Sequence, residues 1–143
     1  MSKQENARRA ESLPTDQRNG LESSVYAPFT ADTFSEYTAR TLALVREGRE
    51  WVAACPAAWA AAQHHVLDCA IAGRRISWHE VASAMLSRDY IDHRNGQNVR
   101  IDNTLGPLFM RWLVGLHPEI EPFMEQRRSR FDEVEIGGPY DLL

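Results

Sequence analysis

Hydrophobic positions recur at the spacing of an α-helix in four stretches of this chain. The first stretch begins with Thr33-Phe-Ser-Glu36, which has the form of a capping box, because its hydroxyl and its carboxylate can each accept a hydrogen bond from a backbone N–H at a helix start. Apolar side chains then follow every three or four residues until Gly48. We therefore predict a first helix over residues 33–48, followed by a linker that contains Trp51.

The second and third helices are marked by their first residues. Pro56 suits the first turn of a helix, where its missing N–H would have no partner in any case, and the apolar face that follows it ends at Gly73. Ser77-Trp-His-Glu80 has the form of a second capping box. The predicted helices span residues 57–72 and 77–88.

The clearest helical pattern is the stretch VRIDNTLGPLFMRWLVGLHPE, residues 99–119. Asp102 and Asn103 offer capping oxygens, and Pro107 lies in the permissive first turn. A broad apolar face follows, and Arg111 is the only charged residue on it. We predict a helix over residues 103–116 whose main role is to fill the core.

The segments around this helix complete the predicted fold. Asn95-Gly96 lies between two short alternating segments and suits a type I′ turn, so we predict a small β-hairpin near residues 90–101. Residues 119–130 fit either a short helix or an edge strand. The predicted fold is mainly α: a single compact domain of about four helices with one small β-hairpin. Its parts are a flexible N-terminal arm, residues 1–28, the helical domain, residues 29–131, and an acidic C-terminal tail, residues 132–143.

Composition and charge narrow the class of protein. The chain has 143 residues, of which 43% are hydrophobic and 25% are charged, as in an ordinary globular domain. Its net charge of -4 argues against a surface that binds polyanions on every side. The longest apolar run, residues 51–62, is shorter than the roughly 20 residues of a membrane span, and the charged N-terminus does not resemble an export signal. We therefore expect a cytoplasmic protein that does not enter a membrane and whose two cysteines stay reduced.

The sequence contains no motif that predicts catalysis. It has no phosphate-binding loop, no GxGxxG and no GxSxG, and Cys55 precedes a proline without glycines to form an oxyanion hole. His65 and Cys69 are four residues apart, and together with other histidines they could offer nitrogen and sulfur to zinc. The other candidate ligands are His64, His79 and His93. Because Cys69 also lies on an apolar face and no CxxC or HExxH occurs, we predict no metal, no other cofactor and no enzyme activity.

The order of these elements resembles that of a winged helix-turn-helix domain. The elements compared are helix 57–72, helix 77–88, helix 103–116 and a wing at residues 122–130. The chain departs from the family at residues 89–102, because a turn of about 3 to 4 residues joins the two helices of a helix-turn-helix. Residues 73–130, with HPE followed by FMEQRRSR, are also similar in style to small proteins of phages and other mobile elements.

The resemblance to winged helix-turn-helix proteins implies a small regulatory protein that binds nucleic acid. Arginines gather near the third predicted helix, around the hairpin and near the C-terminus, and on one face they would position phosphates. The predicted phosphate contacts are Arg74, Arg75, Arg94, Arg100, Arg127, Arg128 and Arg130, and the candidate base readers are Asn103 and Arg111. The alternative interpretation of these arginines is solubilising charge on loops.

A second function remains open on the same sequence. The net charge of -4 and the acidic C-terminal stretch favour a protein–protein interaction module, or a mobile-element inhibitor, for example of a host immune system such as CRISPR, that binds a host protein. Trp51 or Trp78 would then be an exposed anchor for the partner. An exposed apolar patch would also suit a homodimer. The sequence therefore leaves DNA, a host protein and a second copy of the chain as candidate partners.

Overall fold

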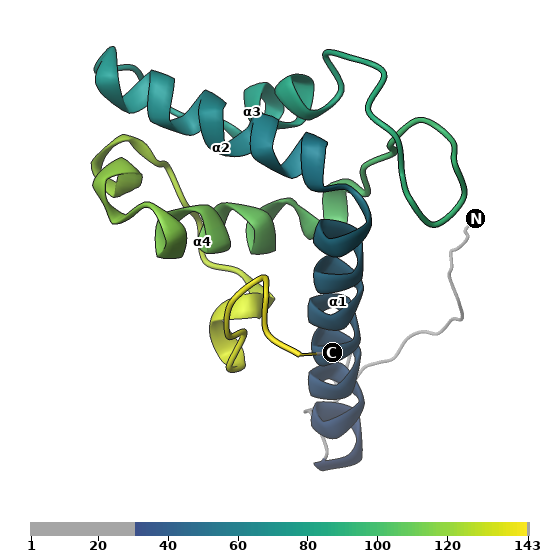
Figure 1. Ribbon diagram of the computed structural model, residues 1–143. Helices are drawn as coiled ribbons and strands as arrows, with labels where there is room; N and C mark the ends of the chain where they lie inside the picture. The colour runs from purple at the N-terminus through teal and green to yellow at the C-terminus, as the bar shows by residue number, and fades with distance from the viewer. Residues whose placement is uncertain (1–30, 143) are drawn as a thin grey trace, which may run out of the picture. The chain divides into compact units, whose positions relative to one another are not determined.

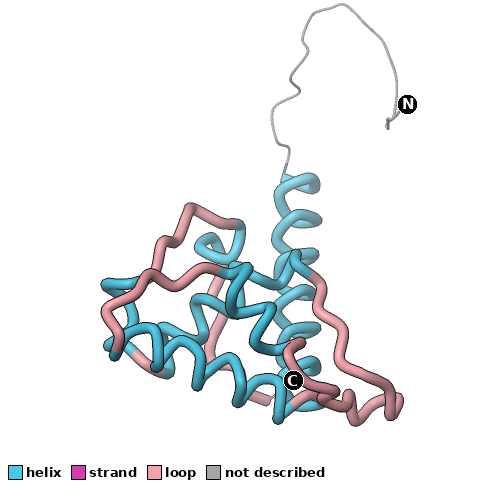
Figure 2. Tube along the Cα trace, turned by 90° about the horizontal axis from the view of Figure 1, so that it is seen from above, coloured by secondary structure: helices cyan, strands magenta, loops and turns pink. Residues whose placement is uncertain are grey.

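The computed structural model describes residues 31–142, and the prediction of a mainly helical protein is confirmed (Figure 1). The α-helices are α1 (Ala31–Ala54), α2 (Pro56–Ile71), α3 (Trp78–Met85) and α4 (Gly106–Leu116), and the short 3-10 helices are η2 (Asn103–Leu105), η3 (Pro118–Phe123) and η4 (Arg130–Glu133). Figure 2 shows helices joined by loops, without a β-strand in this part of the chain. Among the described helices, none combines the length and the apolar character that crossing a membrane requires.

The chain divides into two compact units, residues 1–35 and residues 36–143. Of the first unit, residues 31–35 are described, and they belong to α1. The predicted flexible arm, residues 1–28, lies outside the described residues. All contacts given below are within the second unit.

α1 extends beyond the predicted first helix at both ends. It already contains Ala31, so the prediction that Thr33-Glu36 caps it is wrong. It also continues past Gly48. This glycine faces α4, and a Cβ atom added to it would lie only 2.7 Å from Leu108 Cδ2. Gly48 therefore permits a close helix contact and does not end the helix. Trp51 lies inside α1 and is 4% exposed, so its predicted place in a linker is wrong as well.

The predicted signals around α2 and α3 are confirmed. Gly73 follows the C-cap of α2 with a φ of +68°, a conformation that glycine adopts without strain. Ser77 caps α3, and its Oγ accepts a hydrogen bond from the N–H of Glu80 (3.3 Å). The Glu80 carboxylate lies beside α2, 3.7 Å from His65 Nε2, so the part of the predicted capping box in which Glu80 reaches back to Ser77 is wrong. α3 ends at Met85 and is therefore shorter than predicted.

The predicted β-hairpin does not form strands in the described structure. The turn is present, because Gly96 has a φ of +71°, but only an isolated antiparallel bridge joins Ile91 and Asn98. Beyond this bridge, the N–H of His93 donates to the carbonyl of Ala54 at the end of α1 (2.8 Å) and is not available to a ladder. Tertiary contact with a helix has therefore replaced strand pairing.

The predicted wing at residues 122–130 is also wrong for the described structure. Its start belongs to η3, and Pro122 has no N–H to donate to a ladder. An isolated parallel bridge joins Met124 to Ile76 in the link before α3, with the N–H of Ile76 donating to the carbonyl of Phe123 (2.8 Å). A wing needs an antiparallel pair of strands, and none is seen in residues 122–130 as the structure describes them.

The core is built around Phe109 of α4, which has no exposed surface. The rings of all four tryptophans face it: the centroids of Trp51, Trp59, Trp78 and Trp112 lie 5.0, 5.5, 6.0 and 6.1 Å from its own. Tilted aromatic pairs at such distances contribute about 0.5–1.5 kcal/mol each beyond the burial of apolar area. The prediction that this helix mainly fills the core is therefore confirmed.

The residues after η4 are held against the helices by two side chains. Trp112 Nε1 donates to the carbonyl of Gly137 (2.9 Å), and Arg49 Nε donates to the carbonyl of Gly138 (2.9 Å). Arg49 also lies 3.7 Å from the carboxylate of Asp141. The stretch predicted as an acidic tail thus has hydrogen-bond partners on α1 and α4.

Replacing Gly48 by alanine tests the close contact between α1 and α4. We expect the free energy of unfolding to fall by about 1–3 kcal/mol, because the added methyl group overlaps the Leu108 side chain. The matched control is Gly115→Ala in α4, where a Cβ meets nothing within 4 Å and the helix should gain about 0.5–1 kcal/mol. Urea denaturation of the two variants measures both effects, and equal shifts in the same direction would contradict the assigned contact.

Candidate binding site

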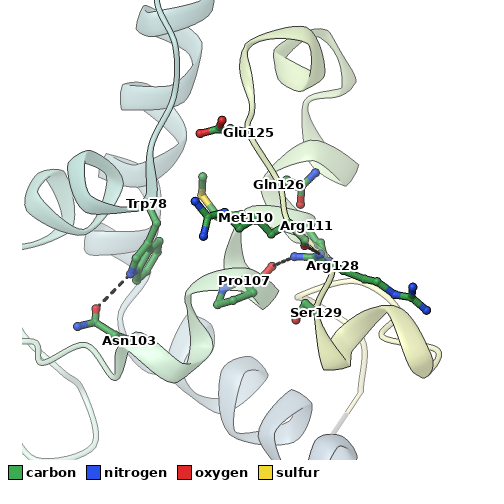
Figure 3. Close-up of a pocket in the computed structure, with 10 residues that line it drawn as sticks. Trp78, Asn103, Pro107, Met110, Arg111, Glu125, Gln126, Arg128 and Ser129 are labelled. Carbon is green, nitrogen blue, oxygen red and sulfur yellow. Dashed lines mark hydrogen bonds between the residues drawn. The ribbon is translucent and has the colours of Figure 1, made fainter.

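A pocket opens between the start of α3, α4 and the segment that joins η3 to η4 (Figure 3). Its volume is about 350 Å³. The residues that line it are Trp78, Asn103, Pro107, Met110, Arg111, Glu125, Gln126, Arg127, Arg128 and Ser129. We call this site the Trp78 pocket. It combines an apolar wall with a polar and charged rim, as binding sites commonly do.

The wall formed by Trp78 depends on a glycine. Trp78 is the first residue of α3, and its indole packs against Gly106 at the start of α4. A Cβ atom on Gly106 would lie 2.8 Å from Trp78 Cε2, so a larger residue would displace the ring. On its polar edge, Trp78 Nε1 donates to Asn103 Oδ1 (3.1 Å), as Figure 3 shows. These two contacts set the orientation of the indole.

Arg111 connects the helical side of the pocket to the segment that closes it. Its Nε and one terminal nitrogen donate to the carboxylate of Asp132 (2.7 and 3.0 Å), and that nitrogen also donates to the carbonyl of Arg127 (2.7 Å). The other terminal nitrogen donates to the carbonyl of Pro107 (2.9 Å). The hydrogen bonds from Arg111 hold the pKa of Asp132 below its usual range. Arg111 is therefore part of the framework of the pocket.

Residues 126–128 form the exposed lip of the pocket. Met124 and Ser129, which flank residues 125–128, have extended backbone conformations, with ψ values of 136° and 158°. Within the described residues, no hydrogen bond involves the backbone N–H of Gln126, Arg127 or Arg128. All three residues are exposed. The lip thus presents backbone donors and two guanidinium groups to the solvent.

The pocket brings together four of the residues predicted to contact nucleic acid. They are Asn103, Arg111, Arg127 and Arg128. Arg75 lies at the edge of the pocket, where it forms an ion pair with Glu125. In the sequence these residues are related only by their charge or polarity. In the structure they differ in whether their side chains are bound by other residues of the protein.

The other predicted arginines do not line the pocket. They are Arg74, Arg94, Arg100 and Arg130. Arg94 donates to the carboxylate of Asp92 (2.8 and 3.0 Å), which is 5% exposed. Arg130 lies over the ring of Tyr37, 4.4 Å from its centroid, and donates to Thr41 Oγ1 (2.9 Å). These two side chains stabilise the fold, because their donors are directed to protein acceptors.

α4 does not present the row of polar side chains that a recognition helix carries into a DNA groove. Six of its 11 residues are buried. The link to α3 also runs from residue 86 to residue 102, much longer than the turn of about 3 to 4 residues in a helix-turn-helix. α4 is therefore not placed to read base edges, since that needs exposed donors and acceptors.

Sequence reasoning named Trp78 as a candidate anchor, and it lines the pocket. It did not name Pro107, Met110 or Gln126 as site residues, because each has an ordinary structural role in its own local pattern. The sequence signal that could have found this wall of the pocket was the pair Gly106-Pro107, because Gly106 leaves room for the indole of Trp78. Recognising it requires knowing that α3 and the start of α4 are neighbours.

Cys55 is a buried cysteine near the Asp92–Arg94 pair. Burial, together with the negative charge of Asp92, raises the pKa of the Cys55 thiol to about 11. The thiol is therefore protonated at neutral pH. This state argues against nucleophilic chemistry at Cys55, since the thiolate is the reactive form.

No protein-family model, curated protein or solved structure matches this chain. The Trp78 pocket, with its lip, is therefore the basis for assigning a function.

Stability should depend on the charge of Asp92 in acid. Hydrogen bonds from Arg94 lower the pKa of Asp92 to about 2, against an ordinary value of 3.8. A lowered folded-state pKa contributes stability above the unfolded value, and this contribution is lost as the pH falls from about 4 to about 2. We expect Asp92→Asn to be less stable than the wild type at pH 6 and to lose less stability over that acid range. Parallel curves of thermal midpoint against pH for the two proteins would contradict this role.

Proposed function

We propose that this protein is a non-catalytic interaction module that holds an extended, acidic segment of a partner protein along the lip of the Trp78 pocket. The observation that carries the proposal is the combination, at one place, of an apolar pocket, two exposed arginines and backbone N–H groups that have no hydrogen-bond partner among the described residues. An inhibitor that binds a host protein would use such a surface. Each of the three features selects one property of the ligand.

The apolar part of the pocket suits one buried side chain of the ligand. Trp78, Pro107 and Met110 line it, and Trp78 is already held in place by Gly106 and Asn103. A preformed wall lowers the entropy lost on binding, because its side chain does not have to be ordered by the ligand. Aromatic side chains in such pockets often contribute most of the binding energy of an interface.

The lip suits a ligand in extended conformation. Exposed backbone donors beside an extended segment are the feature by which a peptide adds itself as a strand. Main-chain hydrogen bonds to residues 126–128 would give affinity, and the side chain that enters the pocket would give specificity.

The charge of the lip favours an acidic segment. Arg127 and Arg128 are exposed, and the Arg128 side chain is 90% exposed with Glu133 no closer than 4.0 Å. The chain as a whole has a net charge of -4, so this local positive charge is a contrast within an acidic surface. Complementary charge of this kind steers the encounter and rejects wrong partners.

Selection from a displayed library of random linear peptides tests this function. We expect the selected peptides to contain aspartate or glutamate around one apolar or aromatic residue. Gln126→Pro should weaken their binding at least about tenfold, because it removes one backbone donor from the lip. The control Gln126→Ala removes the same side chain but keeps the N–H, and it should bind like the wild type.

The charge of the lip is tested separately with Arg127→Glu together with Arg128→Glu, which leaves the side-chain hydrogen bonds of Arg111 and Arg130 in place. We expect this variant to lose the acidic peptides while its thermal midpoint stays within a few degrees of the wild type. A labelled random single-stranded DNA is measured in parallel by fluorescence anisotropy at two salt concentrations. Salt-sensitive DNA binding that survives Gln126→Pro but is lost in the arginine variant would replace the proposed function by a nucleic-acid-binding one. Failure to select any peptide would also overturn the proposal.

A further inference from the structure

A cluster of histidine, cysteine and glutamate side chains lies between α2 and α3, and none of its members lines the Trp78 pocket. His65 Nε2 is 3.5 Å from Cys69 Sγ and 3.7 Å from Glu80 Oε1. Among the described residues, the ligand atoms of these three side chains all lie within 4.8 Å of one another. We propose that they form a zinc-binding site, with water as a fourth ligand.

The distances within the cluster suit a tetrahedral ion. Zinc bonds of about 2.3 Å to sulfur and about 2.0–2.1 Å to nitrogen place these two atoms about 3.5 Å apart at a tetrahedral centre. The separation of Cys69 Sγ and His65 Nε2 has this value before any metal is bound. The Glu80 side chain is 47% exposed, so its carboxylate is free to move toward an ion bound by the other two ligands. A set of nitrogen, sulfur and carboxylate ligands favours zinc over magnesium or calcium, which prefer oxygen.

The positively charged side chain of Arg74 lies beside the proposed zinc ligands. One terminal nitrogen of Arg74 lies 3.3 Å from Cys69 Sγ, and the other lies 3.9 Å from Glu80 Oε1. The cluster therefore already binds a positive charge, and this contact supports a cation site independently of the chemical types of the three ligands. The Arg74 side chain is 55% exposed and follows Gly73 in the link after α2, so it can turn into solvent when zinc replaces it. Displacement of Arg74 is a cost that limits the affinity for zinc.

The burial of the ligands indicates which side of the site stays open. Cys69 has no exposed surface, whereas Glu80 and Arg74 are in contact with solvent. A metal would therefore enter past the Arg74 side chain and reach the sulfur last. Once bound, the ion would join α2 to the first turn of α3 and so stabilise the contact between these two helices.

Titration of the full-length protein with Co²⁺ and then Zn²⁺ tests the site. We expect an absorption band from thiolate to Co²⁺ charge transfer, removed by Zn²⁺, and an increase of the thermal midpoint with Zn²⁺. Cys69→Ser should abolish the band, whereas the control Cys55→Ser, at the other buried cysteine, should keep it. His65→Ala should weaken metal binding at least about tenfold, and the control His64→Ala, at the adjacent exposed residue, should not.

Arg74→Ala gives a test that does not depend on removing a ligand. It should tighten Co²⁺ binding severalfold, because the competing cation is gone while the three ligands remain. Absence of the charge-transfer band in both the wild type and Arg74→Ala would overturn the proposal. So would a band that persists in Cys69→Ser. These results are distinguishable from a failure of the proposed peptide site, because none of the variants changes the lip or the wall of the Trp78 pocket.

Discussion

The contact of one phenylalanine ring with four tryptophans is the interaction on which the arrangement of the helices depends. Phe109 lies on α4, and the tryptophans around it come from α1, α2, α3 and α4 itself. Each helix therefore contributes its largest apolar side chain to the same point. Because such rings are rigid and interlock with little free space, the position of one restricts the positions of the others.

The Trp78 pocket inherits its shape from this arrangement. Trp78 contacts Phe109 with part of its ring and lines the pocket with another part, so the same side chain belongs to the core and to the surface. Two glycines make the dense packing feasible, since Gly48 admits Leu108 and Gly106 admits Trp78. The other side of the pocket is held by Arg111 and Asp132 through hydrogen bonds. A rigid wall and an exposed lip thus meet at one site.

The parts of the fold that were predictable from the sequence are those with local causes. Pro56 at the start of α2, Ser77 at the start of α3 and Pro107 in the first turn of α4 act through their own neighbours, and these helices are confirmed. Gly48 was misinterpreted because its significance lies in a residue of a distant helix. The turn at Asn95-Gly96 is local and present, but strand formation beside it was decided by a contact with α1.

The same distinction applies to the candidate site. Charge clusters are visible in any sequence, and the predicted set includes Arg127 and Arg128, which line the pocket. Whether an arginine has an acidic partner distant in the chain depends on the fold: Arg111 has Asp132, 21 residues away. Such pairs form only when the segments have packed, so composition and spacing carry little information about them. The role of a small residue beneath Trp78 was hidden for the same reason.

The hydrogen bonds that join the C-terminal stretch to the helices also bear on the synthesis of the protein. Arg49 donates to the carbonyl of Gly138 across 89 residues, and Trp59 Nε1 donates to the hydroxyl of Tyr140 across 81 residues (3.0 Å). α1 and α2 therefore leave the ribosome long before these partners have been translated. During that interval the donors of Arg49 and Trp59 lack these acceptors, so the packing of α1 and α2 is completed only at the end of synthesis.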